Sequence, residues 1–235
     1  MVETALTMVA VQEIASRRGW SITFSSVSGA VIAEVRNVIA AHFLKSGADA
    51  LLMMDADQSF GRDSIETMID LGKPMTGCIY PKRKLHWSNV NLEAAANIDE
   101  VLYQASDYVG KLEFSSEGTA NIINGFAKAL HVGTGMLLIR REVFDRLMTR
   151  FPELNNRGFH GDDYPGFEEY NFGFFNHIDL EGECALSEDI SFCQRWRDVG
   201  GEIWADVTSN STHTGRYNFR GNYLDYLKAK GEIDR

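Results

Sequence analysis

Short apolar runs separated by amphipathic stretches make up most of this chain, and this alternation is typical of an α/β protein. The clearest run, 51–54, holds four large apolar residues between glycines at 47 and 61, which predicts a strand covered on both faces. Weaker runs predict further strands at 22–24, 74–80, 111–116, 124–130, 136–139 and 202–205. Apolar positions at helical spacing predict helices at 2–18, 30–46, 62–71, 91–107, 141–150, 186–199 and 222–229. The pattern therefore predicts a single α/β domain over residues 1–235, with a sheet flanked by helices.

Two carboxylates follow the central apolar run, at the point where the strand should end. In open α/β sheets this edge is where ligands bind, and Asp55 and Asp57 would point to the same side of an extended backbone. Carboxylates this close repel one another unless a cation lies between them, and oxygen ligands suit Mg²⁺ or Mn²⁺. About one Asp-x-Asp is expected by chance in such a chain. A solvated turn is therefore the alternative to a metal site.

Charge and cysteine usage restrict the partners and the compartment. The formal net charge of −10 argues against a nucleic-acid-binding surface. The three cysteines lack zinc-like spacing and lie beside apolar residues, which indicates buried thiols and a cytoplasmic protein. We see no signal peptide and no apolar run long enough to span a membrane.

Basic side chains occur where they could meet an anionic ligand. Arg36 is on the helix 30–46 but off its apolar stripe, so it is either an exposed arginine or one that reaches a phosphate at the site. Lys82 belongs to the basic cluster 82–84 after the strand 74–80 and could face a diphosphate, although a charged loop is the commoner case. The glycines around Thr134 allow close approach of a backbone or a ligand. They are not a dinucleotide fingerprint, because the third glycine is missing.

The second half of the chain adds three further candidates. Residues 155–182 form a long loop rich in aromatic residues, which either stack on the sugar of an acceptor or cover the core. Glu188 and Asp189 follow Ser187 at a helix start, where they complement the helix dipole and where a general base would be rigidly held. His213, between hydroxyl residues after the last strand, is a candidate third metal ligand.

In this order the motifs resemble those of the GT-A-fold glycosyltransferases, especially the family-2-like enzymes of bacteria and large DNA viruses. The resemblance spans residues 36–221 and implies a GT-A (Rossmann-like) mixed sheet, a nucleotide-sugar donor, a glycan or other hydroxyl acceptor, and Mn²⁺ or Mg²⁺. It assigns Asp55 and Asp57 to the metal and the donor diphosphate, His213 to the metal, and Asp189, with Glu188 beside it, to the acceptor side. Arg36 would lie near the donor.

One departure and two alternatives accompany this resemblance. Members of that fold normally begin with a central strand that carries part of the nucleotide-base pocket, whereas the first element here is a helix, so we expect a sheet without the usual first strand, or a shortened sequence. A haloacid-dehalogenase-type phosphatase would use Asp55 as its nucleophile and Asp57 beside it. A non-catalytic carbohydrate-binding module is the other alternative. Direct displacement with inversion is the expected mechanism, with retention as its alternative.

Overall fold

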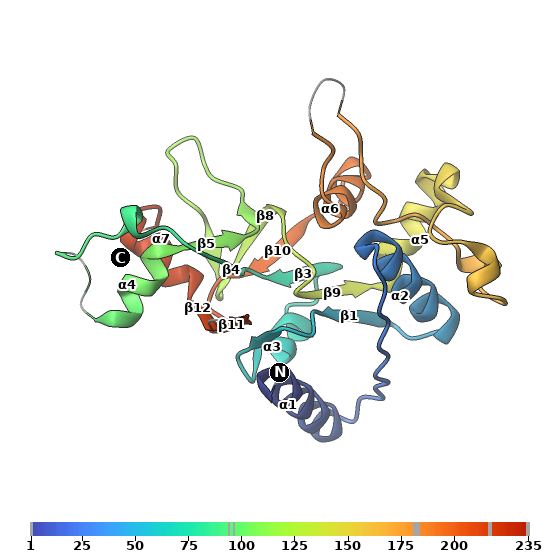
Figure 1. Ribbon diagram of the computed structural model, residues 1–235, viewed down its shortest axis with the longest axis horizontal. Helices are drawn as coiled ribbons and strands as arrows, with labels where there is room; N and C mark the ends of the chain where they lie inside the picture. Colours follow the sequence, from blue (N-terminus) through green and yellow to red (C-terminus); the bar gives the residue numbers. More distant parts are fainter. Residues whose placement is uncertain (1, 94, 96, 181–183, 216–217, 234–235) are drawn as a thin grey trace.

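The computed structural model describes residues 2–93, 95, 97–180, 184–215 and 218–233, and a seven-stranded mixed sheet runs through its centre (Figure 1). The strands lie in the order β1-β9-β3-β10-β8-β6, with β7 beside β8. Only β3 and β10 pair in parallel, and the other pairs are antiparallel. The strands of this sheet are β1 (Ala50–Met54), β3 (Met75–Cys78), β6 (Lys111–Leu112), β7 (Ile122–Ile123), β8 (Phe126–His131), β9 (Met136–Arg140) and β10 (Ile203–Asp206).

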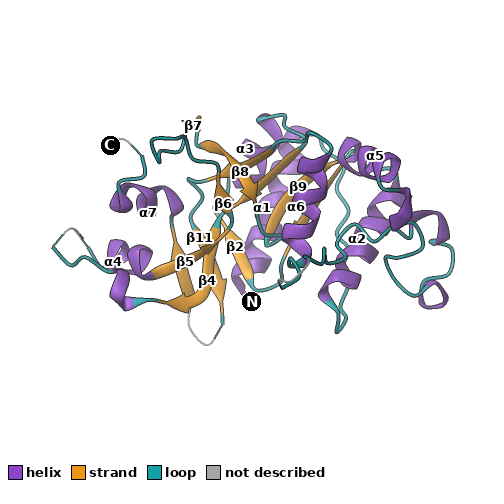
Figure 2. Ribbon diagram, turned by 90° about the horizontal axis from the view of Figure 1, so that it is seen from above, coloured by secondary structure: helices purple, strands orange, loops and turns teal. Residues whose placement is uncertain are grey.

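Helices cover both faces of this sheet (Figure 2). The larger apolar cluster packs one face against α2 (Ile32–Ser46), α5 (Arg141–Arg150) and α6 (Glu188–Asp198). A second cluster packs the other face against α1 (Val2–Arg18) and α3 (Ser64–Asp70). Along β1, Leu51 and Met53 belong to the first cluster, whereas Leu52 and Met54 belong to the second. This alternation is the physical reason for the uniformly apolar run in the sequence.

A smaller lobe lies beside the main sheet (Figure 1). It contains the sheet β12-β11-β2, the ribbon β4-β5, and two helices that pack together. Its elements are β2 (Gln58–Phe60), β4 (Tyr80–Leu85), α4 (Ile98–Ala105), β5 (Ser106–Val109), β11 (Ser211–Thr214), β12 (Asn218–Gly221) and α7 (Tyr223–Lys230). Short 3₁₀ turns occur at Trp87–Asn89, Pro152–Leu154, Gly161–Asp163 and Glu168–Tyr170.

The predicted α/β fold, a mixed sheet flanked by helices, is confirmed. The first described element is the helix α1, and β1 lies at an edge of the sheet: among the described residues, it has only β9 as a strand partner. No helix in the described part of the chain is both long and apolar enough to cross a membrane.

Four predicted elements differ from those in the structure. Residues 22–24 are not a strand, because this exposed run pairs with no other backbone in the described structure. The predicted helix 91–107 begins only at Ile98, where the Asn97 side chain caps it, and gives way to β5 at Ser106. The predicted strand 74–80 is divided, because residues 75–78 pair in the main sheet whereas Tyr80 pairs with Val109 of β5. The strand 111–116 ends at Leu112, before the turn 115–119.

Asp206 is a buried carboxylate at the end of β10 and makes the stability of this fold pH-dependent. It is 3% exposed, and burial raises its pKa, although N–H and O–H donors of Thr208 and Ser209 oppose that rise. Because the folded chain then binds the proton more tightly than the unfolded chain, the stabilising contribution is complete below the ordinary pKa of about 3.9 and is lost as the pH rises through the raised value.

We therefore expect Asp206→Asn, which keeps an oxygen acceptor without the charge, to flatten the pH dependence of the unfolding free energy. At about pH 7 the variant should be more stable than the parent, because it carries no buried charge. Denaturant unfolding at a series of pH values measures this, with the exposed Asp145→Asn as the matched control. An Asp206→Asn variant with the parent's pH profile would contradict the argument.

Candidate functional site

The predicted Asp-Ala-Asp segment forms a braced turn rather than an extended backbone. The Gln58 N–H donates to the Asp55 carbonyl oxygen at 3.2 Å, which closes the turn, and the Asp55 N–H donates to the Gly135 carbonyl oxygen at 3.1 Å. From α1, the buried Thr4 hydroxyl lies 2.8 Å from the carbonyl oxygens of both Ala56 and Gln58. The turn is therefore held from both sides, and its two carboxylates have fixed positions at the end of β1.

His213 is brought to this turn by strand pairing. β11 pairs antiparallel with β2 so that His213 lies opposite Gln58, and the Thr214 N–H donates to the Asp57 carbonyl oxygen at 2.8 Å. The His213 Nε2 atom then lies 3.4 Å from Asp57 Oδ2. The convergence of these residues, more than 150 positions apart in the sequence, follows from this register.

The second nitrogen of His213 decides what Nε2 can do. Nδ1 lies 2.9 Å from the Pro81 carbonyl oxygen, and because that oxygen only accepts, Nδ1 carries the proton. In the neutral ring, Nε2 then presents a lone pair to a carboxylate oxygen that also only accepts. A cation bound by both atoms would make this pair favourable. A backbone carbonyl that orients a histidine in this way is typical of metal-ligating histidines.

Two arginines neutralise the carboxylates. Arg36 is 7% exposed, which excludes the exposed-arginine interpretation; its Nη2 lies 3.8 Å from Asp55 Oδ1, and its Nη1 donates to Glu188 Oε1. Arg83 Nη1 donates to Asp57 Oδ2 at 2.9 Å. Lys82, the basic residue that we predicted for a diphosphate, instead lies 3.8 Å from Asp107.

The start of α6 separates the two acids that we predicted for the acceptor side. Glu188 pairs with Arg36 and so connects α6 to α2. Asp189 Oδ1 accepts hydrogen bonds from the Ser187 hydroxyl and, at 2.8 Å, from the Ile190 N–H. Ser187 occupies the N-cap position, but its hydroxyl donates to Asp189 rather than accepting from the helix backbone. The Asp189 carboxylate is therefore held at the helix start.

The electrostatics of Asp55 reflect the whole group. Desolvation raises the pKa of Asp55, and the negative charges of Asp57 and Asp189 raise it further. The positive charges of Arg36 and His213 lower this pKa. The same field extends to Tyr80, whose pKa burial raises strongly, with Asp55 adding to that effect. The structure thus brings Arg36, Asp55, Asp57, Asp189 and His213 within electrostatic range of one another.

Tyr80 explains the glycines on either side of Thr134. The close approach predicted there is made by the Tyr80 ring: a Cβ at Gly135 would lie 2.5 Å from its Cζ atom, and the Gly135 N–H donates to the Tyr80 oxygen at 3.1 Å. The ring also lies edge-on to that of His213, with centroids 6.0 Å apart. Gly135 also accepts a hydrogen bond from the Asp55 N–H through its carbonyl oxygen, so Tyr80 positions the turn through Gly135. The sequence alone did not indicate this role of Tyr80.

We expect Gly135→Ala to destabilise the fold by about 1–3 kcal/mol, because the added methyl group overpacks against the Tyr80 ring. Urea unfolding measures the change. Gly161→Ala is the matched control, since a Cβ there meets nothing within 4 Å and the backbone is not in the left-handed region. Equal stability of the two variants would contradict the packing role assigned to Tyr80.

A hollow of about 450 Å³ lies beside Asp189. We call it the Asp189 hollow; it is lined by Lys82, Tyr108, Val109, Gly110, Lys111, His131, Ser187, Asp189 and Ile190. Lys111 and His131 were not singled out from the sequence, because they come from strands whose pairing only the fold reveals. Lys82 therefore belongs to this hollow rather than to the carboxylate turn.

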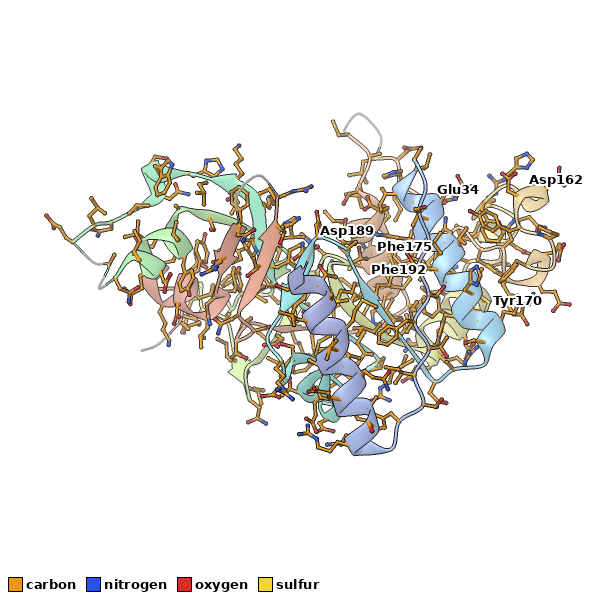
Figure 3. The ribbon with its side chains drawn as sticks, turned by 60° about the horizontal axis from the view of Figure 1, so that its bottom comes forward. Glu34, Asp162, Tyr170, Phe175, Asp189 and Phe192 are labelled. Atoms are coloured by element: carbon orange, nitrogen blue, oxygen red, sulfur yellow. The ribbon has the colours of Figure 1, made fainter. Side chains whose placement is uncertain are left out.

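The aromatic loop 155–182 mainly covers the core, the alternative stated above. Phe174 and Phe175 are fully buried, and Phe175 stacks on Phe192 of α6 with ring centroids 4.3 Å apart. The rings of Phe159, Tyr164, Phe167 and Tyr170 pack on Val38 and Ala41 of α2. Of the described rings in this loop, none lines the Asp189 hollow. Asp162 and Tyr170 lie at one end of the molecule, beyond α2 from Asp189 (Figure 3).

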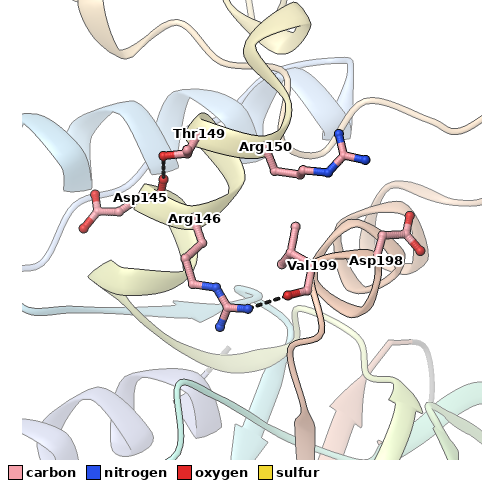
Figure 4. A pocket seen from close by; sticks show the side chains of 6 residues that line it. All are labelled: Asp145, Arg146, Thr149, Arg150, Asp198 and Val199. Carbon is pink, nitrogen blue, oxygen red and sulfur yellow. Dashed lines mark hydrogen bonds between the residues drawn. The ribbon is translucent and has the colours of Figure 1, made fainter.

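A second hollow, of about 540 Å³, lies between α5 and the end of α6 (Figure 4). Its polar groups serve helix packing: Arg146 donates to the Val199 carbonyl oxygen, the Thr149 hydroxyl donates to the Asp145 carbonyl oxygen, and Asp198 accepts from Gln194. The carboxylate turn and the Asp189 hollow are therefore the stronger candidate site.

The comparisons with known proteins add little to this geometry. No family model matches the chain, and no curated protein matches it. The solved structure of A197 from STIV is similar, with a TM-score of 0.44 and 13% sequence identity, covering 91% of this chain and 87% of that chain. A similarity of this size carries no function from one chain to the other.

Proposed function

We propose that this chain is a metal-dependent glycosyltransferase that moves a sugar from a nucleotide-sugar donor to an acceptor hydroxyl with inversion. The observation that carries the proposal is the pair of Asp57 and His213. The Nε2 atom of the ring faces Asp57 Oδ2 at 3.4 Å while Nδ1 is engaged by a backbone carbonyl oxygen. With Asp55 beside it, this set provides two carboxylates and one oriented imidazole at the end of a sheet strand.

The chemistry of these donors fits Mn²⁺ or Mg²⁺. Carboxylate oxygens suit both ions, and Asp55, Asp57 and His213 would hold the ion. As placed in the described structure, no group of three or more His, Cys, Asp or Glu residues already forms a metal-binding cluster. When bound, a divalent ion would neutralise charge on the diphosphate leaving group.

Three charged side chains would divide the remaining work. Arg36 and Arg83 would bind the oxygens of the donor diphosphate, because a guanidinium presents paired N–H donors to such groups. Asp189 would receive the proton of the acceptor hydroxyl on Oδ2, since Oδ1 already accepts two hydrogen bonds. As the hydroxyl oxygen bonds to the anomeric carbon, the bond from that carbon to the diphosphate breaks and its electron pair leaves with the diphosphate. Attack from the opposite face inverts the configuration.

The two alternatives have less support. A phosphatase of the haloacid-dehalogenase type would have its later Gly-Asp motif after a strand, whereas the Gly161–Asp163 turn belongs to the aromatic loop and Asp162 lies beyond α2 (Figure 3). A purely carbohydrate-binding module does not need three carboxylates close together. Here the charges of Asp57 and Asp189 raise the pKa of Asp55, which shows that this arrangement is costly. Cys78 and Cys193 are free, buried thiols as predicted, whereas the free thiol of Cys184 is exposed, so that part of the prediction was wrong. Free thiols suit a reducing compartment, and we propose a cytoplasmic location.

A panel of nucleotide sugars scored by thermal shift, with and without Mn²⁺, tests the proposal. We expect one nucleotide base to raise the melting temperature, and only when Mn²⁺ is present. Stabilisation by phosphate esters but by no nucleotide sugar would favour a phosphatase. Stabilisation by free glycans alone would favour a binding module.

A further inference from the structure

The Asp189 hollow brings two cationic side chains together in a protein that is otherwise acidic. The chain carries a formal net charge of −10, yet the hollow is lined by Lys82, Lys111 and His131 against the single carboxylate of Asp189. Lys82 has a partner, Asp107, at 3.8 Å, outside the hollow's lining. Lys111 makes no ion pair with any residue that the structure describes. Lys111 is exposed, so its charge is available to an anionic ligand that enters the hollow.

Strand pairing fixes the relative positions of Lys111 and His131. Lys111 of β6 lies directly opposite His131 of β8, so their side chains project from the same face of the sheet. The positive charges of Lys111 and Lys82 lower the pKa of His131, after the larger effect of burial, while Asp189 opposes that shift. The histidine, both lysines and Asp189 are therefore close enough to act on one bound molecule.

The cations of the hollow are separate from those at the carboxylate turn. Arg36 and Arg83 contact Asp55 and Asp57, and neither arginine lines the hollow. Asp189 connects the two regions, since it lines the hollow and also acts on Asp55. One diphosphate would use the arginines, which leaves the lysines and the histidine for the second substrate.

We propose that the Asp189 hollow binds the acceptor, and that this acceptor carries an anionic group, a phosphate or a carboxylate, near the hydroxyl that reacts. Lys82 and Lys111 hold the anion through their charge, the His131 ring contributes an N–H donor, and Asp189 receives the hydroxyl proton. The volume of about 450 Å³ is sufficient for a sugar-sized acceptor. The role as acceptor rests on the proposed glycosyltransferase function, whereas anion binding in the hollow does not.

Anion binding is tested on the chelator-treated protein with inorganic phosphate and with acetate as probes. The NMR signals of the His131 ring report on the hollow directly. We expect phosphate, acetate or both to shift these signals in a saturable way, and the stronger probe indicates which anion the acceptor carries. Lys82→Gln and Lys111→Gln should each weaken binding by about tenfold, the effect of losing one charged hydrogen bond.

Lys84→Gln is the matched control, because Lys84 is an exposed lysine of the same strand as Lys82 but does not line the hollow. It should leave the binding of both probes unchanged. Unmoved His131 signals with both probes would overturn the inference. Equal weakening by Lys84→Gln would also overturn it, because general attraction to a basic surface would then explain the result.

Turnover separates this inference from the proposed function. With a bound nucleotide sugar, we expect glucose 6-phosphate or glucuronate to be a better acceptor than glucose, and Lys111→Gln to raise its KM about tenfold while kcat changes little. Equal use of glucose and unchanged KM in Lys111→Gln would overturn the acceptor assignment and leave the glycosyltransferase proposal intact. If His131 responds to phosphate but no nucleotide sugar binds, the anion site stands and the glycosyltransferase proposal is overturned.

Discussion

Asp57→Asn is expected to abolish both divalent-metal binding and transfer from a nucleotide sugar. Asp57 is the residue that both His213 and Arg83 contact, and an amide oxygen cannot replace the charge that a divalent ion requires. Since even residues that only orient metal ligands alter metal affinity by about 10–100-fold, the loss of Asp57 should exceed about 100-fold. Calorimetric titration with Mn²⁺ and turnover assays before and after EDTA treatment measure the two effects.

The exposed Asp63→Asn, in the turn before α3, is the matched control for a change of charge nearby. It should bind Mn²⁺ as the parent does. Full turnover in EDTA, or normal metal affinity in Asp57→Asn, would remove the basis of the metal assignment. Circular dichroism should show that Asp57→Asn keeps its fold, because the hydrogen bonds that close the turn come from its backbone.

Asp189→Asn should lower kcat by roughly 10²–10⁴-fold with donor binding unchanged, as expected for the loss of a general base. The Ser187 and Ile190 hydrogen bonds leave one carboxylate oxygen of Asp189 available, and this residue lines the hollow. Glu188→Gln should behave differently, since Glu188 contacts Arg36. We expect it to weaken donor binding, because Arg36 loses the partner that holds its guanidinium near Asp55.

These two variants are each other's control, and both are measured at saturating donor and acceptor. A normal kcat in Asp189→Asn together with an inactive Glu188→Gln would reverse the two roles. If both variants turn over normally, neither acid is the base. The acidic residues 162, 163, 168 and 169 are then poor substitutes, because they belong to the loop beyond α2 (Figure 3).

Much of the fold follows from local pattern in the sequence. The run 51–54 became β1 because alternate residues meet helices on opposite faces, and the helix starts near 32, 141 and 188 match the apolar periodicity. The position of β1 at the sheet edge did not follow, since pairing depends on β9, which comes more than 80 residues later. The false strand at 22–24 has the same cause: three apolar-rich residues form a strand only where a partner backbone is available.

The candidate site was predictable as a set of residues but not as contacts. Asp55, Asp57 and His213 were named from residue type and position, and the register of β11 on β2 explains why Asp57 and His213 meet. The sequence analysis placed Lys82 near the diphosphate, but the structure places Arg83 at the carboxylate turn instead. This could not be predicted, because neighbouring strand residues point to opposite sides and only the fold decides which side faces the turn. His131 and Lys111 were missed because no motif marks them.

On the proposed function, the arginine contacts described above predict that the metal ion and the donor bind in a mutually dependent way. Without other cations, Arg36 and Arg83 act as the counter-ions of Asp55 and Asp57. An incoming divalent ion would replace them, and the released guanidinium groups would then be available to the phosphate oxygens of the donor. By thermodynamic linkage, each ligand must strengthen the binding of the other by the same factor, typically about 5–150-fold. Loss of the diphosphate after transfer would return both arginines to the carboxylates and loosen the ion, which resets the site for the next donor.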